Sequence, residues 1–367
     1  MKQETGLLYR LHIDGWLLLG VVLLLITSTL VVYSASGGEW SVVQRHLMRV
    51  GVAFVLMLIF AQIPPRQLML WAPWLFLLGI VLLIAVLVAG KVGKGAQRWL
   101  DLGVIRFQPS ELMKLALPMF LAWLYAWSPM PPNWPRLAVG FGSIALTAGL
   151  IVVQPDLGTA LLIASSGLFV LFFVGLPWKV ILGVLVAAVA AAPVVWHFMY
   201  DYQKQRVLTF LNPESDPLGA GYHIIQSKIA IGSGGLWGKG FMGSTQAHLE
   251  FLPESTTDFI FSVFSEEFGL WGVALLLAGY TFVIFRGFYI ALTADDNFGR
   301  LLAAALSMTL FTYAFVNIGM VSGLLPVVGL PLPLISYGGS ALVTLMIGFG
   351  VLMSIRTHRR FMGSQST

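Results

Sequence analysis

The sequence contains no cysteine and very little charge. Without cysteine, the chain has no disulfide framework, no thiolate metal site and no cysteine nucleophile. Charged residues make up 10% of its 367 residues and hydrophobic residues 58%, whereas soluble domains average about 25% and about 45–50%. Together with a mean hydropathy of +0.86, this imbalance excludes an ordinary soluble enzyme, a disordered chain and a nucleic-acid-binding domain.

The hydrophobic residues gather in runs that are long enough to cross a bilayer. A membrane-spanning helix needs about 20 mostly apolar residues, and its backbone must satisfy its own hydrogen bonds in lipid. The strict alternation of a membrane barrel is absent. We therefore expect an all-α, polytopic integral membrane protein with about ten transmembrane helices, at 15–34, 47–63, 71–90, 111–127, 137–153, 157–175, 180–199, 258–286, 300–320 and 338–355.

The charged residues predict the orientation of the chain. A net charge of +5 is typical of basic cytoplasmic flanks, and the short loops near the span ends favour a cytoplasmic location for both termini. Segment 200–257 is then a long extracytoplasmic loop between the seventh and eighth helices, which mixes Tyr, Trp, Phe, Pro and charge. Because the sequence contains no internal repeat and no separate soluble segment, residues 1–367 are expected to form a single membrane domain.

A few polar residues lie in or beside the predicted spans, where charge is expensive and usually functional or paired. Thr256 or Thr257 is expected to cap the eighth helix, which places Asp258 in its first turn. By helical spacing, Asp258, Ser262 and Glu266 share one face. Asp258 is then either a general base at the outer membrane surface or a carboxylate that satisfies the helix N-terminus. Glu266 is either a structural partner or part of a proton relay.

Other charges lie close to predicted helix starts. Glu111 suits the positive end of the fourth helix, and Glu111 and Lys114 are spaced to form an ion pair. Arg98, Arg106 and Lys114 could together contact a phosphate, although binding to lipid headgroups explains the same excess of basic residues equally well. Asp156 is expected to cap or begin the sixth helix, as a turn residue or as a ligand contact.

Two segments are rich in glycine or proline. Segment 232–240 follows no predicted strand and matches no nucleotide-binding motif, so a bent loop is expected, with phosphate binding by backbone N–H groups as the alternative. Segment 331–340 is predicted to be a re-entrant or broken element at membrane depth. The six histidines lack metal-ligand spacing, so the sequence leaves the metal requirement open.

At these motifs the sequence resembles the SEDS family (shape, elongation, division and sporulation), in particular its rod-shape branch rather than its division branch. Several long motifs in the same order, from the third predicted span to the tenth, make the resemblance specific. It is carried by Arg98-Trp99-Leu100, Gln108 to Lys114, Gln154 to Ala160, Asn212-Pro213 through Gly221-Tyr222-His223, Gln226 to Gly240, Leu252 to Gly269 and Asn317 to Ser340.

The resemblance implies a glycosyltransferase of the bacterial plasma (inner) membrane, a peptidoglycan polymerase that joins lipid II into glycan strands on the extracytoplasmic face for cell elongation and rod shape. It implies a class B penicillin-binding protein as the transpeptidase partner, together with other membrane proteins of the elongation complex. It also implies that the carboxylate of the Thr-Asp-Phe motif, Asp258, is the catalytic residue. A lipid II flippase or transporter and a non-catalytic scaffold for the penicillin-binding protein are the alternatives.

For this reaction, an α-linked diphosphate donor and a β-1,4 product fit a single inverting displacement, in which Asp258 takes the proton of the acceptor hydroxyl. The departing diphosphate needs positive charge, and a divalent cation, Mg²⁺ or Mn²⁺, is compatible with this chemistry. Supporting roles are assigned to Glu111, Asp156, Ser262 and Glu266. The candidate cationic side chains for substrate binding are Arg98 and Lys114, followed by Lys204, Arg206 and Lys239.

Overall fold

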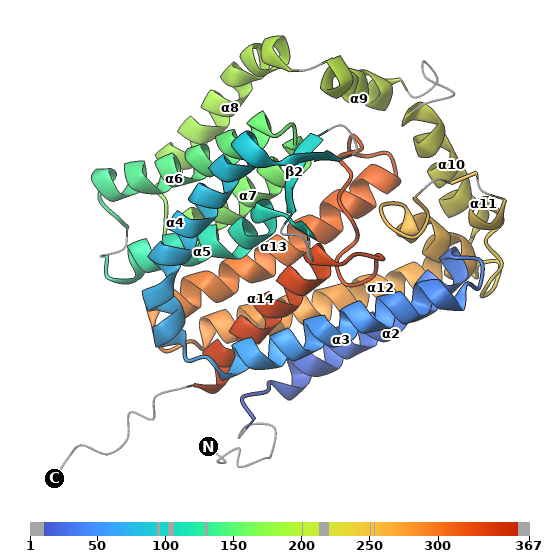
Figure 1. The fold of residues 1–367 in the computed structure, drawn as a ribbon, viewed down its shortest axis with the longest axis horizontal. Coiled ribbons are helices and arrows are strands. Elements are labelled where there is room, and N and C mark those ends of the chain that lie inside the picture. The colour runs from blue at the N-terminus through green and yellow to red at the C-terminus, as the bar shows by residue number, and fades with distance from the viewer. Residues whose placement is uncertain are drawn as a thin grey trace.

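Helices account for almost all of the fold (Figure 1). The computed structural model describes residues 11–93, 96–101, 106–128, 131–199, 201–212, 220–249, 251–252 and 254–358. A helix occupies each range that the hydrophobic runs predict to span a membrane. The helices are α2 (Gly15–Ala35), α3 (Trp40–Gln62), α4 (Pro65–Ala89), α5 (Pro109–Ala126), α6 (Trp134–Val153), α7 (Leu157–Phe173), α8 (Trp178–Phe198), α9 (Asp201–Leu211), α10 (Ala220–Ser233), α11 (Thr245–His248), α12 (Ile260–Leu292), α13 (Asn297–Val321) and α14 (Ser340–Thr357).

Many of these helices have the length and composition of membrane spans. Within the described residues, 7 helices are long and apolar enough to cross a membrane, and α7 and part of α8 are shorter apolar helices. The prediction of a helical, polytopic membrane protein is therefore confirmed, while the count of ten spans stays a prediction. The 7 helices are α2, α3, α4, α6, α12, α13 and α14.

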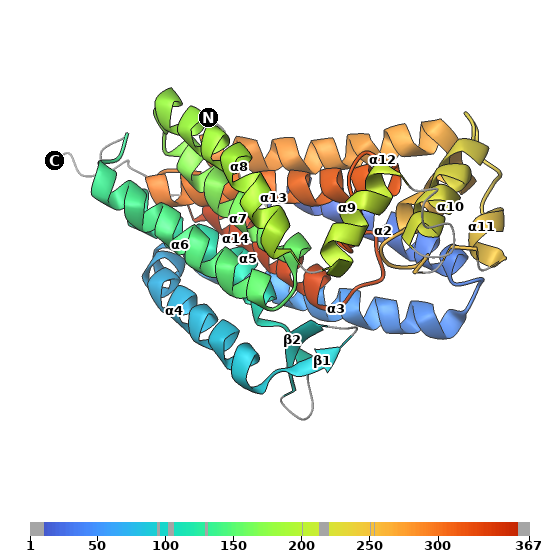
Figure 2. The same ribbon diagram turned by 90° about the horizontal axis from the view of Figure 1, so that it is seen from above.

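One small sheet departs from the all-α prediction. The segment between α4 and α5 forms three antiparallel strands in the order β1-β2-β3 (Figure 2), with Leu100 of β2 opposite Phe107 of β3. The segment lies between two predicted spans, 71–90 and 111–127, where strand edges are tolerated because water can hydrogen-bond them. The sheet places Arg98 on its middle strand. The strands are β1 (Lys91–Gly93), β2 (Ala96–Asp101) and β3 (Arg106–Phe107).

The C-terminal helices form the centre of the bundle. The apolar windows of α13 and α14 are 61% and 67% buried, whereas those of α3 and α4 are only 22% buried. Away from the helix ends, the exposed side chains of α3 and α4 are apolar, as expected of helices that face lipid. Helices α8 and α9 arc along the outer side of the bundle (Figure 1). Segment 200–257, which the sequence predicts as one long loop, contains three helices, α9, α10 and α11.

The two ends of the described chain lie side by side. The His12 ring stacks on the His358 ring at a centroid distance of 3.8 Å. Nearby, Asp14 caps α2 and accepts two hydrogen bonds from the guanidinium of Arg286 on α12, at 2.9 and 2.6 Å. The chain ends are therefore tied together at the end of the bundle where α14 finishes.

Helix α12 is broken at Gly269, which has φ 61° and ψ −163°, a conformation essentially restricted to glycine. The N–H groups of the two residues after the break donate to carbonyls of the glycine-rich loop 232–240, at 3.0 and 3.3 Å. In return, the carbonyls of Glu266 and Glu267 accept from N–H groups of the same loop, at 2.9 and 3.0 Å. The loop thus replaces the hydrogen bonds that the helix loses, which a break within a membrane requires.

Replacing Gly269 by alanine is expected to lower the free energy of unfolding by about 2 kcal/mol or more, because a non-glycine residue in such a conformation costs of order 1–3 kcal/mol. The added Cβ would also lie 2.8 Å from the backbone of Leu236. Thermal unfolding in detergent micelles measures the loss. The control is Gly51→Ala on α3, where an added Cβ meets nothing within 4 Å. Equal stability of the two variants would contradict the prediction.

Candidate active site

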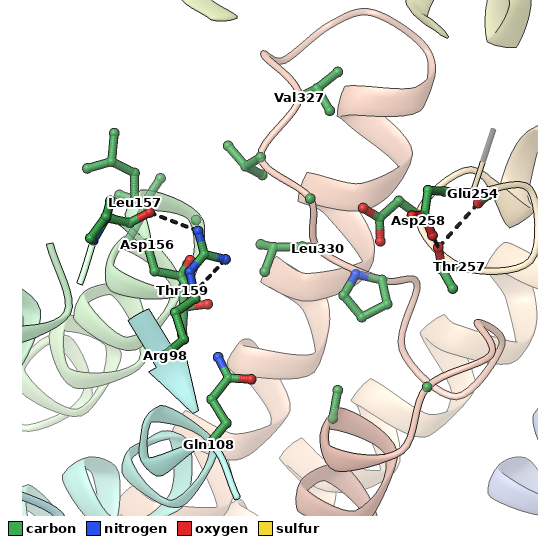
Figure 3. Close-up of a pocket in the computed structure, with 18 of the residues that line it drawn as sticks. Arg98, Gln108, Asp156, Leu157, Thr159, Glu254, Thr257, Asp258, Val327 and Leu330 are labelled. Carbon is green, nitrogen blue, oxygen red and sulfur yellow. Dashed lines mark hydrogen bonds and ion pairs between the residues drawn. The ribbon is translucent and has the colours of Figure 1, made fainter. Parts of the chain in front are cut away.

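A cavity of about 640 Å³ lies where α5, α7 and α14 begin (Figure 3). The N-terminal ends of helices carry partial positive charge and bind anions, so three such ends converge on one space. The remaining walls come from α9, the turn before α12 and the irregular segment 326–339. This segment includes most of the range predicted as a re-entrant or broken element. The cavity brings together several residues predicted from the sequence: Arg98, Glu111, Lys114, Asp156, Arg206 and Asp258.

Asp258 lies on a turn, residues 254–259, and lines the cavity with its side chain partly exposed. Across from it, the segment 326–339 passes close by: a Cβ added at Gly329 would lie 3.5 Å from Asp258 Oδ2. The prediction that Asp258 occupies the first turn of a helix capped by a threonine is wrong. Helix α12 begins at Ile260, and its N-cap, Phe259, makes no side-chain cap. The turn instead directs its backbone carbonyls to α13 and to segment 326–339.

Arg98 and Asp156 form one side of the cavity (Figure 3). Arg98 Nη2 donates to the Pro155 carbonyl at 2.8 Å, and Arg98 Nη1 lies 3.4 Å from Asp156 Oδ2. Asp156 also accepts a hydrogen bond from Thr159 N at 3.2 Å, which confirms its predicted role as the N-cap of α7. A third of the Arg98 side chain is exposed, so its guanidinium remains accessible from the cavity.

Glu111 and Lys114 lie on the first turns of α5 and form the predicted ion pair, with a distance of 2.6 Å between Lys114 Nζ and Glu111 Oε1. The pair is buried, and Lys114 Nζ also lies 5.0 Å from the centre of the Tyr313 ring. Glu111 Oε2 is buried without a hydrogen-bond partner among the described residues. A buried charge pair of this kind is costly to break, and both residues line the cavity floor.

Two predicted cations lie on α9, and only one of them reaches the cavity. Arg206 lines the cavity and donates to the Val327 carbonyl of segment 326–339 at 3.4 Å. Lys204 does not line the cavity; its Nζ lies 3.5 Å from the His197 carbonyl. Successive positions on a helix point in different directions, so a cluster of basic residues in the sequence does not share one face.

Three further predicted residues lie away from the cavity, on the other side of α12. The Glu266 carboxylate pairs with Lys239 Nζ at 2.6 Å and accepts from Ser244 Oγ at 2.7 Å and from Thr245 N at 3.1 Å. Ser262 is fully buried, and its hydroxyl has no partner within the described residues. The predicted polar face running from Asp258 is therefore absent, since Asp258 precedes the helix. Lys239 neutralises Glu266 and holds the loop 232–240, rather than facing the cavity.

Sequence reasoning did not assign a role to several residues at the site. Gln108 and Tyr337 line the cavity, and the Arg49 guanidinium lies 4.4 Å from the centre of the Tyr337 ring. Asn317 lies on α13 and donates to the Asp258 carbonyl at 2.9 Å. A signal existed for Asn317, because a polar amide in an apolar helix is rarely incidental. Gln108 and Tyr337 lie in motifs that carry the family resemblance, but only the folded chain shows that they reach the cavity.

The metal requirement can be compared with the side chains present. In the described part of the chain, no three His, Asp or Glu side chains gather closely enough to hold a metal ion. Of the carboxylates that line the cavity, Glu254 and Asp258 share the turn before α12, whereas Glu111 and Asp156 lie on other elements. A Mg²⁺ or Mn²⁺ ion thus stays a prediction, and oxygens of a bound diphosphate would have to supply most of its ligands.

Comparison with known proteins places the chain in a family. The sequence model of the cell cycle protein family, which includes FtsW, RodA and SpoVE, matches residues 7–361. The chain belongs to this SEDS family. Among SEDS relatives, the chain is 54% identical to the peptidoglycan glycosyltransferase MrdB of Escherichia coli K12 over 355 residues, which is 96% of each chain. It is 39% identical to MrdB of Helicobacter pylori J99, over 97% of this chain and 93% of the relative.

Solved SEDS structures agree with this assignment. A peptidoglycan synthase complex that coordinates polymerization and crosslinking contains a chain that superposes with a TM-score of 0.81 at 34% identity, over 94% of this chain and 97% of that one. The rod shape determining protein RodA of Thermus thermophilus superposes with a TM-score of 0.71 at 29% identity, over 94% and 96% of the two chains. The whole helical membrane fold is therefore shared.

Proposed function

We propose that this cavity is the active site of a peptidoglycan glycosyltransferase, which polymerises lipid II into glycan strands for cell elongation and rod shape. The relatives that match nearly the full length of the chain carry this activity in their names. The observation that carries the proposal is the convergence of the Asp258 carboxylate, which is partly exposed, with the cations Arg98, Lys114 and Arg206 on a single cavity. A sugar hydroxyl and a diphosphate leaving group need these two kinds of partner.

In the proposed reaction, the acceptor hydroxyl oxygen attacks the anomeric carbon of the donor. Asp258 takes the hydroxyl proton as the new C–O bond forms, which makes the oxygen a better nucleophile. The bond from the anomeric carbon to the diphosphate oxygen breaks, and undecaprenyl diphosphate leaves with the electron pair. One displacement inverts an α-linked donor to a β-1,4 product.

The departing diphosphate gains charge in the transition state, and preorganised positive groups lower the barrier. We assign this role to the guanidinium of Arg98 and the ammonium of Lys114, with Arg206 at the cavity wall. The α14 N-terminus adds unpaired N–H groups, since its N-cap, Gly339, provides no side-chain cap. These positive groups come from four elements, so only the folded chain brings them together.

The proposed location is the bacterial plasma membrane, with both termini in the cytoplasm and the cavity on the extracytoplasmic face. Two observations support this arrangement. His12 and His358 are in contact, so the chain ends lie on one side. Helix α14 begins at the cavity and ends beside His358, and its 18 residues correspond to about 27 Å at about 1.5 Å per residue, close to the hydrocarbon thickness of a bilayer.

The proposed partner is a class B penicillin-binding protein that crosslinks the strands, joined by other membrane proteins of the elongation complex. A solved relative belongs to a complex that coordinates polymerization and crosslinking, which supports a partner with transpeptidase activity. A polymerase that makes glycan strands outside the cytoplasm needs a transpeptidase on the same side of the membrane to crosslink them. The flippase and scaffold alternatives make different predictions for the purified protein.

The direct test uses the full chain, purified with its partner and reconstituted in proteoliposomes with labelled lipid II. We expect glycan strands to form, with one molecule of undecaprenyl diphosphate released for each glycosidic bond. Movement of labelled lipid II across the bilayer without polymer would identify a transporter and overturn the proposal. A complex that neither polymerises nor transports the lipid would favour the scaffold.

A further inference from the structure

The turn that carries Asp258 is held by its backbone. Three consecutive carbonyls, those of Thr256, Thr257 and Asp258, each accept a hydrogen bond from segment 326–339 or from α13. Tyr337 N donates to the first at 2.9 Å, Ser336 Oγ to the second at 2.6 Å and Asn317 Nδ2 to the third at 2.9 Å. These bonds tie the turn that carries the Asp258 side chain to distant parts of the chain, in addition to the bonds that the turn makes within itself.

Asn317 joins the two walls on either side of the carboxylate. Its amide nitrogen donates to the Asp258 carbonyl and, at 2.7 Å, to the carbonyl of Leu330 in segment 326–339. Both hydrogens of the amide are therefore used, and the orientation of the amide is determined because two carbonyls can only accept. The side chain is fully buried.

The carbonyl oxygen of the Asn317 amide, unlike its nitrogen, makes no hydrogen bond within the described part of the chain that would explain its position. Asn317 Oδ1 is buried without a hydrogen-bond partner among the described residues. An unsatisfied buried oxygen is unfavourable, and such groups in native structures usually reflect a functional constraint. An apolar side chain would avoid this penalty but would release the turn. The presence of asparagine at this position therefore points to a requirement for the two donated bonds.

Ser336 also ties segment 326–339 to the turn, through the carbonyl of Thr257, the residue before Asp258. Its hydroxyl donates to the Thr257 carbonyl and accepts from Leu332 N at 2.7 Å. Ser336 is buried, and it tightens segment 326–339 against the turn. The segment and the turn together form the wall of the cavity that contains Asp258.

We propose that Asn317 and Ser336 are positioning residues that hold the Asp258 carboxylate at the distance from the acceptor hydroxyl that proton transfer needs. The proposal rests on the proposed function, in which Asp258 is the base. Displacing a reacting group by about 1 Å reduces a rate by about 10²-fold. Loss of the tether should therefore slow the chemical step while leaving donor binding unchanged, because the cations Arg98 and Lys114 lie on other elements.

The test compares Asn317→Leu with Thr309→Val in the purified complex with its partner. Leucine matches the size of asparagine but donates no hydrogen bond. Thr309 is a buried residue of the same helix whose hydroxyl donates to the Ala305 carbonyl within α13, at 2.8 Å. Binding of lipid II gives the number of occupied sites, and the rate of polymer formation is expressed per occupied site.

We expect Asn317→Leu to lower kcat per occupied site by about 10²-fold, with KM for lipid II changed by less than threefold. Ser336→Ala should lower kcat by about tenfold, because one of the three carbonyl bonds is lost. Thr309→Val should keep the wild-type rate. A purely structural role would instead reduce the number of sites and leave the rate per site unchanged, which would overturn the proposal.

Three outcomes separate this inference from the proposed function. If the wild-type complex makes no polymer from lipid II, the proposed function itself fails. If Asp258→Asn polymerises lipid II at the wild-type rate, the polymerase activity stands but Asp258 is not the base, and the positioning role has no basis. If Asp258→Asn is inactive while Asn317→Leu and Ser336→Ala keep the wild-type kcat, only the positioning role fails. Should Asn317→Leu give no folded complex, Ser336→Ala decides between the same outcomes.

Discussion

Replacing Asp258 by asparagine is expected to lower the rate of glycan polymerisation by about 10²- to 10⁴-fold, the range that general base catalysis contributes. Asparagine keeps the size of the side chain and one oxygen acceptor but cannot take the acceptor proton. The backbone carbonyl of residue 258 still accepts from Asn317 in this variant, so the turn and the cavity should persist. The rate is measured with lipid II in the reconstituted complex.

The control for Asp258→Asn is Asp295→Asn, the same change at an exposed residue between α12 and α13, outside the cavity. Asp295→Asn should keep the wild-type rate, and both variants should bind lipid II and the partner normally. Wild-type polymerisation by Asp258→Asn would exclude this carboxylate as the base. Loss of lipid II binding in Asp258→Asn would instead assign Asp258 to substrate binding.

Replacing Lys114 by methionine is expected to have two separable effects. The change leaves Glu111 buried without its partner, which lowers the free energy of unfolding by about 3–5 kcal/mol. It also removes a charge-assisted contact to the diphosphate, which lowers the affinity for lipid II by about 10- to 100-fold. Thermal unfolding measures the first effect, and equilibrium binding of lipid II to the folded fraction measures the second.

The double variant Glu111→Gln with Lys114→Met separates the two effects. It removes both charges of the pair, so most of the lost stability should return, whereas the affinity for lipid II should stay low. Wild-type affinity in the stable double variant would show that Lys114 serves only the ion pair, which is the alternative that the sequence left open. Arg98→Gln offers a comparison, because Arg98 is partly exposed and its loss should weaken binding with little effect on stability.

Local patterns in the sequence predicted much of the site. Glu111 and Lys114 are three residues apart on one helix, so their contact depends on helical geometry alone. Asp156 precedes an apolar run, and its capping bond reaches only three residues ahead. These contacts need no knowledge of the rest of the fold, and the structure has both.

The interpretation of the eighth helix failed for a tertiary reason. The stretch from Thr256 to Glu266 has the composition of a capped helix, and helical spacing would place its polar residues on one face. In the structure, distant residues of α13 and segment 326–339 bind the carbonyls at its start, so the helix begins two residues after Asp258. Lys239 likewise approaches Glu266 across 27 residues, a distance along the chain that no local pattern encodes.

The sequence by itself determined that this is a helical membrane protein of the SEDS family and which carboxylate is its leading catalytic candidate. Hydrocarbon admits only segments that satisfy their own backbone, so the apolar runs specify the spans. Only the tertiary structure decided which polar residues share a cavity. Helices that pack side by side bring together residues far apart in the chain. The turn before α12 presents Asp258 to the cavity, whereas Glu266 on α12 pairs with Lys239 of the loop 232–240 away from it.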